Sequence, residues 1–229
     1  MIERFEIDIP EEKILKIKDK VKKYPWNLIP NLPNWEHGTN LPFLKEICDY
    51  WVNDFNWKIY EKKINYFKNF KTKVDDIEIH FIKEEGSSSD PKPLLLMHGW
   101  PGSIIEFIEI INQLAHPENY GGSKEDGMTI IVPSLPGFGF SGAPNKPYGP
   151  RKIAEILNKM MTVNLKYKNY LAQGGDWGAT IANWLGYDHN SYCKAIHINC
   201  LTMQHPDGPQ TEEEKKWKKK FDKDQIIQD

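Results

Sequence analysis

Cysteine is scarce in this sequence and shows none of the spacings that bind metals or build disulfide frameworks. The three cysteines, Cys48, Cys193 and Cys200, are odd in number and include no Cys-x-x-Cys pair. A disulfide-held secreted domain is therefore not expected, and we interpret the cysteines as buried thiols of a protein from a reducing compartment. The histidines are scattered and form no His-Glu-x-x-His motif, so no metal and no other cofactor is predicted.

The sequence also lacks an excess of charge and a long apolar run. Its 30 Lys and Arg residues balance 32 Asp and Glu residues, which gives no electrostatic reason to expect nucleic acid as a partner. No stretch of about 18 apolar residues occurs, and Glu3 and Arg4 stand where a signal peptide needs apolar residues. We expect a globular, cytoplasmic protein without an integral membrane segment, and 39% hydrophobic residues suffice for a packed core.

Helical patterns dominate residues 1–70. A first amphipathic stretch follows Pro10 and carries apolar residues at helical spacing, Ile14, Ile17 and Val21. A second helix is expected to begin at Asn40, whose side chain can accept hydrogen bonds from the first free backbone N–H groups. The aromatic-rich segment 51–70 continues this apolar surface, which we interpret as a helical stripe that packs on another part of the protein.

Extended structure is predicted from Lys73 onward. In 73–82, apolar residues alternate on both sides of Asp75-Asp76, as in a β-hairpin. Four short apolar runs follow, interleaved with helical patterns; the runs cover 94–97, 129–132, 170–172 and 195–198, and the helical patterns 104–114 and 153–165. Buried runs of this length separated by helices predict a parallel, doubly wound sheet, and therefore an α/β fold.

The segment Gly174-Gly175-Asp176-Trp177-Gly178 joins a predicted strand to the small-residue start of a predicted helix. Glycines two residues before and two residues after Asp176 let a strand turn sharply into a helix, which is the nucleophile-elbow pattern. A carboxylate at this tip can attack a saturated carbon and leave an ester that water hydrolyses later. The sequence therefore indicates Asp176 as a nucleophile in a strained backbone conformation.

His98-Gly99-Trp100-Pro101-Gly102 directly follows another predicted strand. In hydrolases with such an elbow, a loop at this place and the residue after the nucleophile each offer a backbone N–H to an oxyanion. We assign these two donors to Trp100 and Trp177. His98 is interpreted as an organiser of its loop, together with Gly99 and Pro101, and not as a proton acceptor.

A third loop, 134–141, follows the run at 129–132 and is rich in glycine and proline. The three motifs, each at the C-terminal end of a predicted strand, resemble the epoxide hydrolases, and within them the microsomal and juvenile-hormone type. His-Gly-Trp-Pro-Gly-Ser at 98–103 and Gly-Gly-Asp-Trp-Gly at 174–178 are the most specific parts of the resemblance. Residues 1–70 resemble the N-terminal extension of the same family.

The resemblance implies an α/β-hydrolase fold and a cofactor-free reaction. Asp176 would open a small apolar epoxide to an alkyl-enzyme ester, and water would release a vicinal diol. Roles in detoxification and aromatic hydrocarbon catabolism, and a peripheral association with the endoplasmic reticulum, are implied in the same way. The resemblance also divides the chain into an extension at 1–70, the first part of the hydrolase core at 71–208 and the start of a lid at 209–229, where Thr211 opens a helix-capping pattern.

Measured against the family's pattern, the sheet is expected to be incomplete, since the final strands, the lid tyrosines and a late histidine with its acidic partner lie beyond these residues. The strand at 195–198 would then form an open edge that favours self-association. His189, His197 and His205 are the remaining candidates for a base, and His197 is interpreted as a core residue of its strand. Turnover by these 229 residues is not expected.

Two other interpretations stay open. A haloalkane dehalogenase also carries an aspartate elbow followed by tryptophan, although the extension at 1–70 disfavours it. A non-catalytic relative retained for binding would lack the base, the acid partner and the lid.

Overall fold

The structure is a computed structural model that describes residues 1–28, 34–36, 38–200 and 207–226. The chain forms two compact units. The first consists of Met1–Ile7 and Tyr60–Thr202, and the second of Asp8–Ile59 and Met203–Asp229. The boundaries expected at residues 70 and 208 divide the chain into domains of the family, whereas these units are defined by contacts within the structure. The expected domain boundaries therefore stay a prediction.

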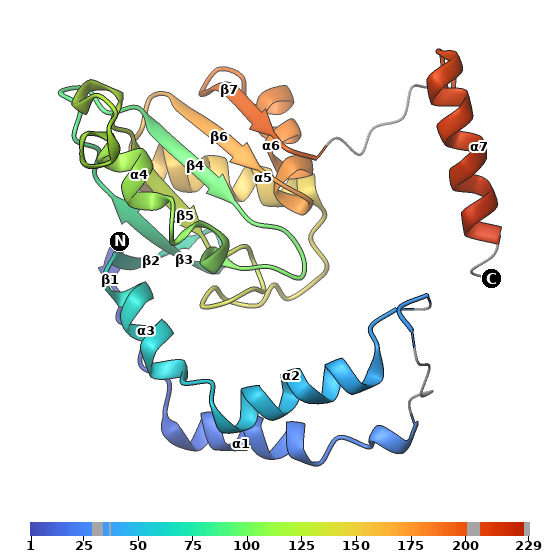
Figure 1. The fold of residues 1–229 in the computed structure, drawn as a ribbon. Helices are drawn as coiled ribbons and strands as arrows, with labels where there is room; N and C mark the ends of the chain where they lie inside the picture. Colours follow the sequence, from blue (N-terminus) through green and yellow to red (C-terminus); the bar gives the residue numbers. More distant parts are fainter. Residues whose placement is uncertain (29–33, 37, 201–206, 227–229) are drawn as a thin grey trace. The chain divides into compact units, whose positions relative to one another are not determined.

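The described part of the first unit is built on one seven-stranded sheet with the order β1-β2-β3-β5-β4-β6-β7 (Figure 1). The strands are β1 (Ile2–Arg4), β2 (Lys68–Val74), β3 (Ile77–Glu84), β4 (Pro93–Met97), β5 (Thr129–Pro133), β6 (Tyr170–Gly174) and β7 (Cys193–Ile198). The last four run parallel to one another, as predicted. The first three pair antiparallel with their neighbours, so the sheet is mixed and not purely parallel.

The β2–β3 hairpin turns at Asp75-Asp76, as expected. Asp75 has φ 53°, a left-handed conformation that a two-residue hairpin turn requires. The prediction that helical structure reaches residue 70 is wrong, since β2 begins at Lys68. The buried positions of β2 include Asn69 and Thr72, whose polar side chains hide the alternation by which a half-buried strand is recognised.

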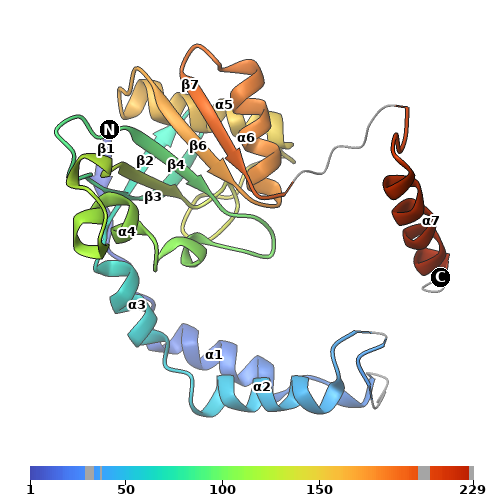
Figure 2. The ribbon, with the colours of Figure 1, turned by 45° about the horizontal axis from the view of Figure 1, so that its top comes forward.

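Helices cover both faces of the sheet. Figures 1 and 2 show α5 (Pro150–Lys159) and α6 (Trp177–Asp188) on one face and α4 (Ile111–Ala115) on the other. The core under α5 and α6 includes Phe81, Leu95, Ile131, Leu157 and Ile181. The helix expected at 104–114 is split into a 3-10 turn, Ile104–Phe107, and α4, and the helix expected at 153–165 ends as the π-helical segment Met160–Asn164.

The second unit contains the expected helices. They are α1 (Glu11–Lys22), α2 (Leu41–Asn53) and α7 (Glu212–Ile226), with a 3-10 turn at Trp26–Leu28, while α3 (Trp57–Asn65) continues into the first unit. Asn40 caps α2 by accepting a hydrogen bond from Phe43 N at 3.1 Å. Thr211 caps α7 through Glu214 N at 3.1 Å. Within the described residues, no helix combines the length and apolar character needed to span a bilayer.

Strand β7 is an edge of the sheet in the part of the chain that the structure describes. It pairs with β6 alone, and residues 194–197 are exposed, Ile196 to 38%. The interpretation of His197 as a core residue is wrong, since His197 is exposed. The cysteines also differ from expectation: burial raises the pKa of Cys193 to about 11, but Cys48 is half-buried and Cys200 is exposed.

Candidate active site

The elbow between β6 and α6 holds Asp176 in a strained conformation. Asp176 has φ 50° and ψ −121°, a region that costs a non-glycine residue about 1–3 kcal/mol. The surrounding turn fixes it, since Ala179 N donates to Gly175 O at 3.2 Å and Thr180 N donates to Asp176 O at 3.3 Å. The carboxylate therefore projects from the tip of the turn and is exposed.

The elbow glycines allow backbone segments to approach one another closely. A Cβ at Gly178 would fall on the Met97 carbonyl oxygen at the end of β4, and a Cβ at Gly174 would fall on the Gly178 carbonyl. A Cβ at Gly175 would fall on the Asn199 side chain. The first turn of α6 is thus pressed against the end of β4, and a side chain at these positions would force the segments apart.

The loop after β4 reaches the carboxylate of Asp176. Trp100 N donates to Asp176 Oδ1 at 2.8 Å, and Trp177 N also hydrogen-bonds the carboxylate. Both hydrogen bonds lower the pKa of the Asp176 carboxyl, and the one from Trp100 has the larger effect. The approach depends on Gly99, where a Cβ would strike the Asp176 side chain.

His98 is fully buried and uses both ring nitrogens to hold loops in place. Leu135 N donates to His98 Nε2 at 3.1 Å, so Nε2 carries no proton, and Nδ1–H donates to Gly99 O at 2.9 Å. Burial lowers the pKa of His98, which keeps the ring neutral. Both ring nitrogens of His98 thus hydrogen-bond the backbone of neighbouring loops, and His98 does not hydrogen-bond Asp176.

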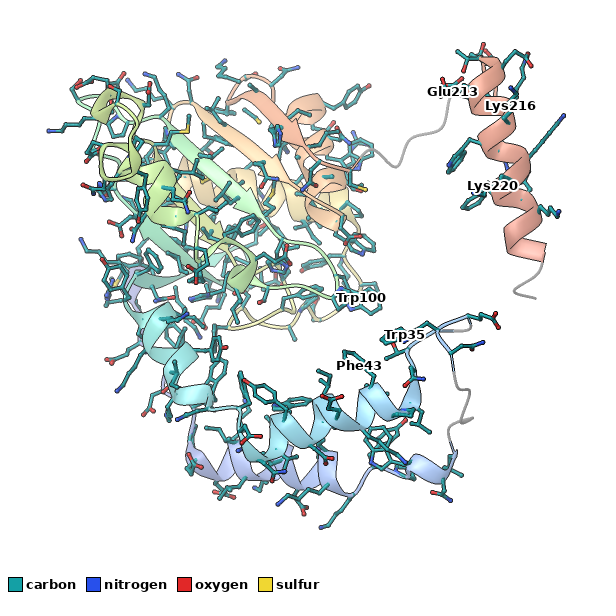
Figure 3. The ribbon with its side chains drawn as sticks, viewed as in Figure 1. Trp35, Phe43, Trp100, Glu213, Lys216 and Lys220 are labelled. Atoms are coloured by element: carbon teal, nitrogen blue, oxygen red, sulfur yellow. The ribbon has the colours of Figure 1, made fainter. Side chains whose placement is uncertain are left out.

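An apolar pocket of about 360 Å³ adjoins the elbow, and Trp100 and Trp177, the two residues whose N–H groups bind Asp176, both line it. Trp100 stands on the loop after β4 (Figure 3). Sequence reasoning missed the remaining lining residues because loops and helices far apart in the chain supply them: Leu135, Pro136, Phe138, Pro144, Tyr148, Ile153 and Ile181. The pocket fits a small apolar molecule next to a carboxylate.

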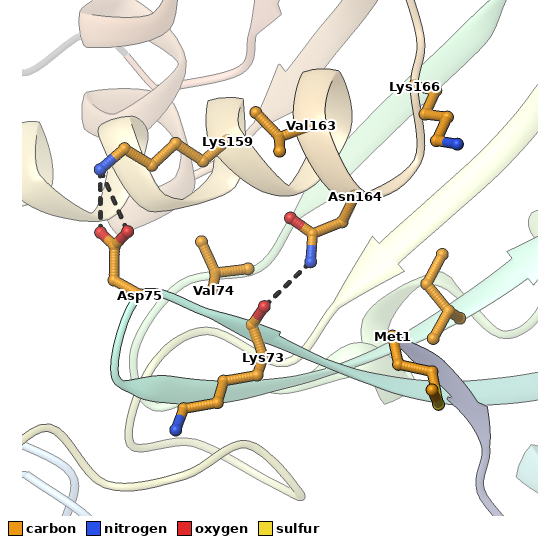
Figure 4. Close-up of a pocket in the computed structure, with 9 residues that line it drawn as sticks. Met1, Lys73, Val74, Asp75, Lys159, Val163, Asn164 and Lys166 are labelled. Carbon is orange, nitrogen blue, oxygen red and sulfur yellow. Dashed lines mark hydrogen bonds and ion pairs between the residues drawn. The ribbon is translucent and has the colours of Figure 1, made fainter.

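A larger cavity of about 700 Å³ shares no residue with this pocket (Figure 4). Its lining includes Lys159, which pairs with Asp75 at 2.9 Å, and Asn164, which donates to Lys73 O at 2.9 Å. It contains no residue of the elbow or of the 98–102 loop. The smaller pocket is therefore the candidate site.

Of the three histidines considered as a base, the two that the structure describes, His189 and His197, do not hydrogen-bond the carboxylate. His189 follows α6 as its C-cap, His197 is exposed on β7, and His205 lies outside the described residues. Trp100 and Trp177 supply the hydrogen bonds recorded for the Asp176 carboxylate. Among the described residues, no group of three or more His, Cys, Asp or Glu side chains could hold a metal ion.

Comparison with known proteins agrees with this geometry. Residues 92–226, more than half of the chain, match the family model of the alpha/beta hydrolase fold, and residues 2–107 match that of the epoxide hydrolase N terminus. Asp176 stands at the strand-to-helix turn after β6, the place where hydrolases of this fold carry their nucleophile elbow. The chain belongs to the α/β-hydrolase family, and over its matched residues it is similar to epoxide hydrolases and juvenile hormone epoxide hydrolases.

Individual relatives match most of this chain but only part of their own length. Epoxide hydrolase 1 of Oryctolagus cuniculus is 36% identical over 86% of this chain and 44% of its own length, and juvenile hormone epoxide hydrolase 1 of Ctenocephalides felis is 37% identical over 79% and 39%. The juvenile hormone epoxide hydrolase structure from Bombyx mori superposes with a TM-score of 0.76 at 32% identity, covering 87% of this chain and 53% of that one. The chain thus spans under half the length of the curated relatives it matches.

Substitution of Gly178 is expected to destabilise the fold. Gly178→Ala should lower the free energy of unfolding by about 1–3 kcal/mol or more, because its Cβ overlaps a backbone carbonyl that cannot rotate away. Gly186→Ala is the matched control in the same helix, since its Cβ meets only the Ile196 side chain, at 3.3 Å. Urea unfolding of both variants checks this, and equal stabilities would contradict the close approach of α6 to β4.

The Asp176 carboxyl is expected to titrate below 3.8, its ordinary pKa. The N–H groups of Trp100 and Trp177 stabilise the ionised form of the carboxyl. Their contribution to the stability of the fold is therefore fully present above the ordinary pKa, and it is lost as the pH falls through the lowered pKa of the folded state. The ¹³C chemical shift of the carboxyl reports the midpoint. Trp100→Phe, which keeps the backbone N–H, should leave the midpoint low, whereas Gly99→Ala should raise it.

Proposed function

We propose that this chain carries the nucleophilic half of an epoxide hydrolase, in which Asp176 opens a small apolar epoxide through an alkyl-enzyme ester on the way to a vicinal diol. The observation that carries the proposal is the ionised Asp176 carboxylate, held at Oδ1 by Trp100 N at 2.8 Å and placed beside an apolar pocket. The names of the relatives add support, since both curated proteins above are called epoxide hydrolases.

In the first step, a carboxylate oxygen of Asp176 attacks an oxirane carbon. A C–O bond forms, the ring C–O bond breaks, and its electron pair stays on the departing oxygen, which takes a proton from an acid. The backbone donors keep the carboxylate ionised and oriented, and the apolar pocket beside it would bind the carbon part of the epoxide. Gly174, Gly175 and Gly178 shape the elbow on which this carboxylate stands.

In the second step, water attacks Cγ of the Asp176 ester, and the negative charge develops on the carbonyl oxygen. When this intermediate collapses, the bond from Cγ to the alkyl oxygen breaks, the leaving alkoxide takes the proton lost by the water, and the diol is released. Trp100 N and Trp177 N are the donors that would stabilise this oxyanion. His98, Gly99 and Pro101 hold the loop that presents Trp100. A base must take a proton from the attacking water, and no described histidine hydrogen-bonds the carboxylate. General base assistance raises a reaction rate by about 10²- to 10⁴-fold. Without it, hydrolysis of the ester should be slower than its formation, and the ester should accumulate.

The proposal extends to the location and role of the protein. Unpaired cysteines fit a cytoplasmic protein, and a nucleophile that captures electrophilic epoxides fits detoxification, including that of aromatic hydrocarbon epoxides. A peripheral attachment to the endoplasmic reticulum is suggested only by resemblance.

Incubation of the 229-residue chain with styrene oxide is expected to give a covalent adduct of one equivalent on Asp176 and little diol. Intact mass and peptide mapping locate the adduct, and chromatography measures styrene glycol. The Asp176→Asn variant should form no adduct. Absence of an adduct in the parent chain would sink the enzyme proposal and favour a non-catalytic binding role, whereas sustained diol formation would reveal a base among the remaining residues, with His189, His197 and His205 first to be replaced.

Association through β7 is expected for the isolated chain, because its exposed backbone edge carries the apolar side chain of Ile196. Light scattering should show a mass that rises with concentration. Replacement Ile196→Lys puts a charge on the edge and should suppress this rise, while Lys194→Arg is the matched control that leaves the edge charge unchanged. A constant monomeric mass of the parent at high concentration counts against the interface.

A further inference from the structure

The 134–141 loop forms one wall of the pocket beside Asp176. It supplies Leu135, Pro136 and Phe138 to the lining and leaves the sheet from the end of β5. Strand β5 lies between β3 and β4, so the loop emerges with a neighbouring strand on each side. A buried histidine from each neighbour hydrogen-bonds the start of this loop.

The two histidines bind adjacent residues. From the β4 side, His98 accepts from Leu135 N at 3.1 Å. From the β3 side, His80 Nδ1 lies 2.9 Å from Ser134 Oγ. The first contact belongs to the loop organiser already described, whereas His80 has no part in the proposed chemistry. Its partners therefore need a separate explanation.

The proton positions around His80 follow from its partners. Asn69 Nδ2 donates to Ile64 O and Phe67 O, each at 3.0 Å, so Asn69 Oδ1 is the acceptor for His80 Nε2–H at 3.0 Å. His80 Nδ1 is then unprotonated and accepts from the Ser134 hydroxyl. The resulting tautomer, with the proton on Nε2, is opposite to that of His98.

Ser141 closes the network at the other end of the loop. His80 N donates to Ser141 Oγ at 2.9 Å, and Ser141 Oγ donates to Ser134 O at 2.7 Å. In return, Ser134 N donates to His80 O at 2.9 Å. One residue of β3 thus binds both ends of the loop, through its ring and through its backbone.

The centre of the network is buried, and both ring nitrogens of His80 have a hydrogen-bond partner. His80 and Ser134 are 0% and 1% exposed, and the rings of Phe5 and Phe140 pack edge-on against the imidazole at 5.5 and 5.2 Å. Burial, and to a smaller extent the charge of Lys71, lowers the pKa of His80 to about 3. The imidazole is therefore neutral at neutral pH and keeps Nδ1 available as an acceptor.

We propose that His80 is a positioning residue, which fixes the 134–141 loop through Ser134 and Ser141 and so sets the apolar wall that selects the substrate at Asp176. This inference rests on the proposed function, because the wall is argued to contact the epoxide. It predicts that weakening the network impairs binding in the pocket more than it impairs the reactivity of Asp176, which other residues hold.

The tautomers provide a test that needs no activity. In the full chain labelled with ¹⁵N-histidine, long-range ¹H–¹⁵N spectra at pH 7 should show His80 with its proton on Nε2 and His98 with its proton on Nδ1. Ser134→Ala should shift the His80 Nδ1 resonance and leave that of His98 in place. A charged His80, or the same tautomer for both rings, would overturn the assignment.

Binding provides the second test. Styrene glycol is titrated into the chain while the Leu135 amide resonance is followed. Ser134→Ala and Ser141→Ala should each raise the dissociation constant about threefold to tenfold, the range that one buried hydrogen bond commands. Thr129→Val is the matched control: Thr129 is 2% exposed, donates its hydroxyl to Glu85 Oε2 at 3.3 Å and begins the same strand at the end away from the loop. It should change the constant less than about twofold.

Alkylation by styrene oxide separates binding from reactivity. In Ser134→Ala the half-saturating epoxide concentration should rise by the same factor as the dissociation constant, while the limiting rate of adduct formation stays within about twofold. Equal effects of Ser134→Ala and Thr129→Val, a loss confined to the limiting rate, or no glycol binding by the parent chain would overturn the positioning role. Binding that responds as expected without any adduct would instead remove the proposed function and leave the wall as part of a binding site.

Discussion

The close approach of the α6 N-terminus to the end of β4 is the constraint on which the site depends. With no side chain at Gly178, the first turn of α6 sits against the Met97 carbonyl, and with none at Gly99 the next loop reaches the Asp176 side chain. This contact puts Trp100 N 2.8 Å from Asp176 Oδ1. A separation larger by one methyl group would remove that hydrogen bond, and the carboxylate would lose the donor that lowers its pKa most.

The parallel pairing of β4 with β5 and β6 extends this constraint to the pocket. Parallel strands end at the same side of a sheet, so the loops after β4, β5 and β6 meet there and deliver Trp100, Leu135 and Trp177 to one cavity. Loops of this kind are held by hydrogen bonds rather than by regular structure. Neutral His80 and His98 supply such hydrogen bonds, because in each ring one nitrogen donates and the other accepts.

The sequence was sufficient where a local pattern determines the structure. The β4, β5 and β6 runs, the elbow at Asp176 and the Asn40 cap are each written in a few adjacent residues and were predicted correctly. The errors arise where distant residues decide. The start of β2 at Lys68 depends on buried polar partners, and the exposure of His197 depends on what pairs with its strand. The pocket walls come from several separate segments, and the His80 network joins His80 to Ser134, 54 residues further along the chain; no spacing rule reveals such contacts.

The division of labour between the two loops explains why a strained nucleophile can persist here. The conformation of Asp176 costs about 1–3 kcal/mol, and the turn hydrogen bonds of α6 together with the donors from Trp100 and Trp177 offset this cost while the loop that carries Trp100 stays in place. His98 ties the Trp100 loop to Leu135, and His80 ties the Leu135 loop to β3. The strain at the elbow is thus balanced by the turn of α6 and the loop that presents Trp100, whereas the hydrogen bonds that end in the antiparallel half of the sheet hold the apolar wall of the pocket.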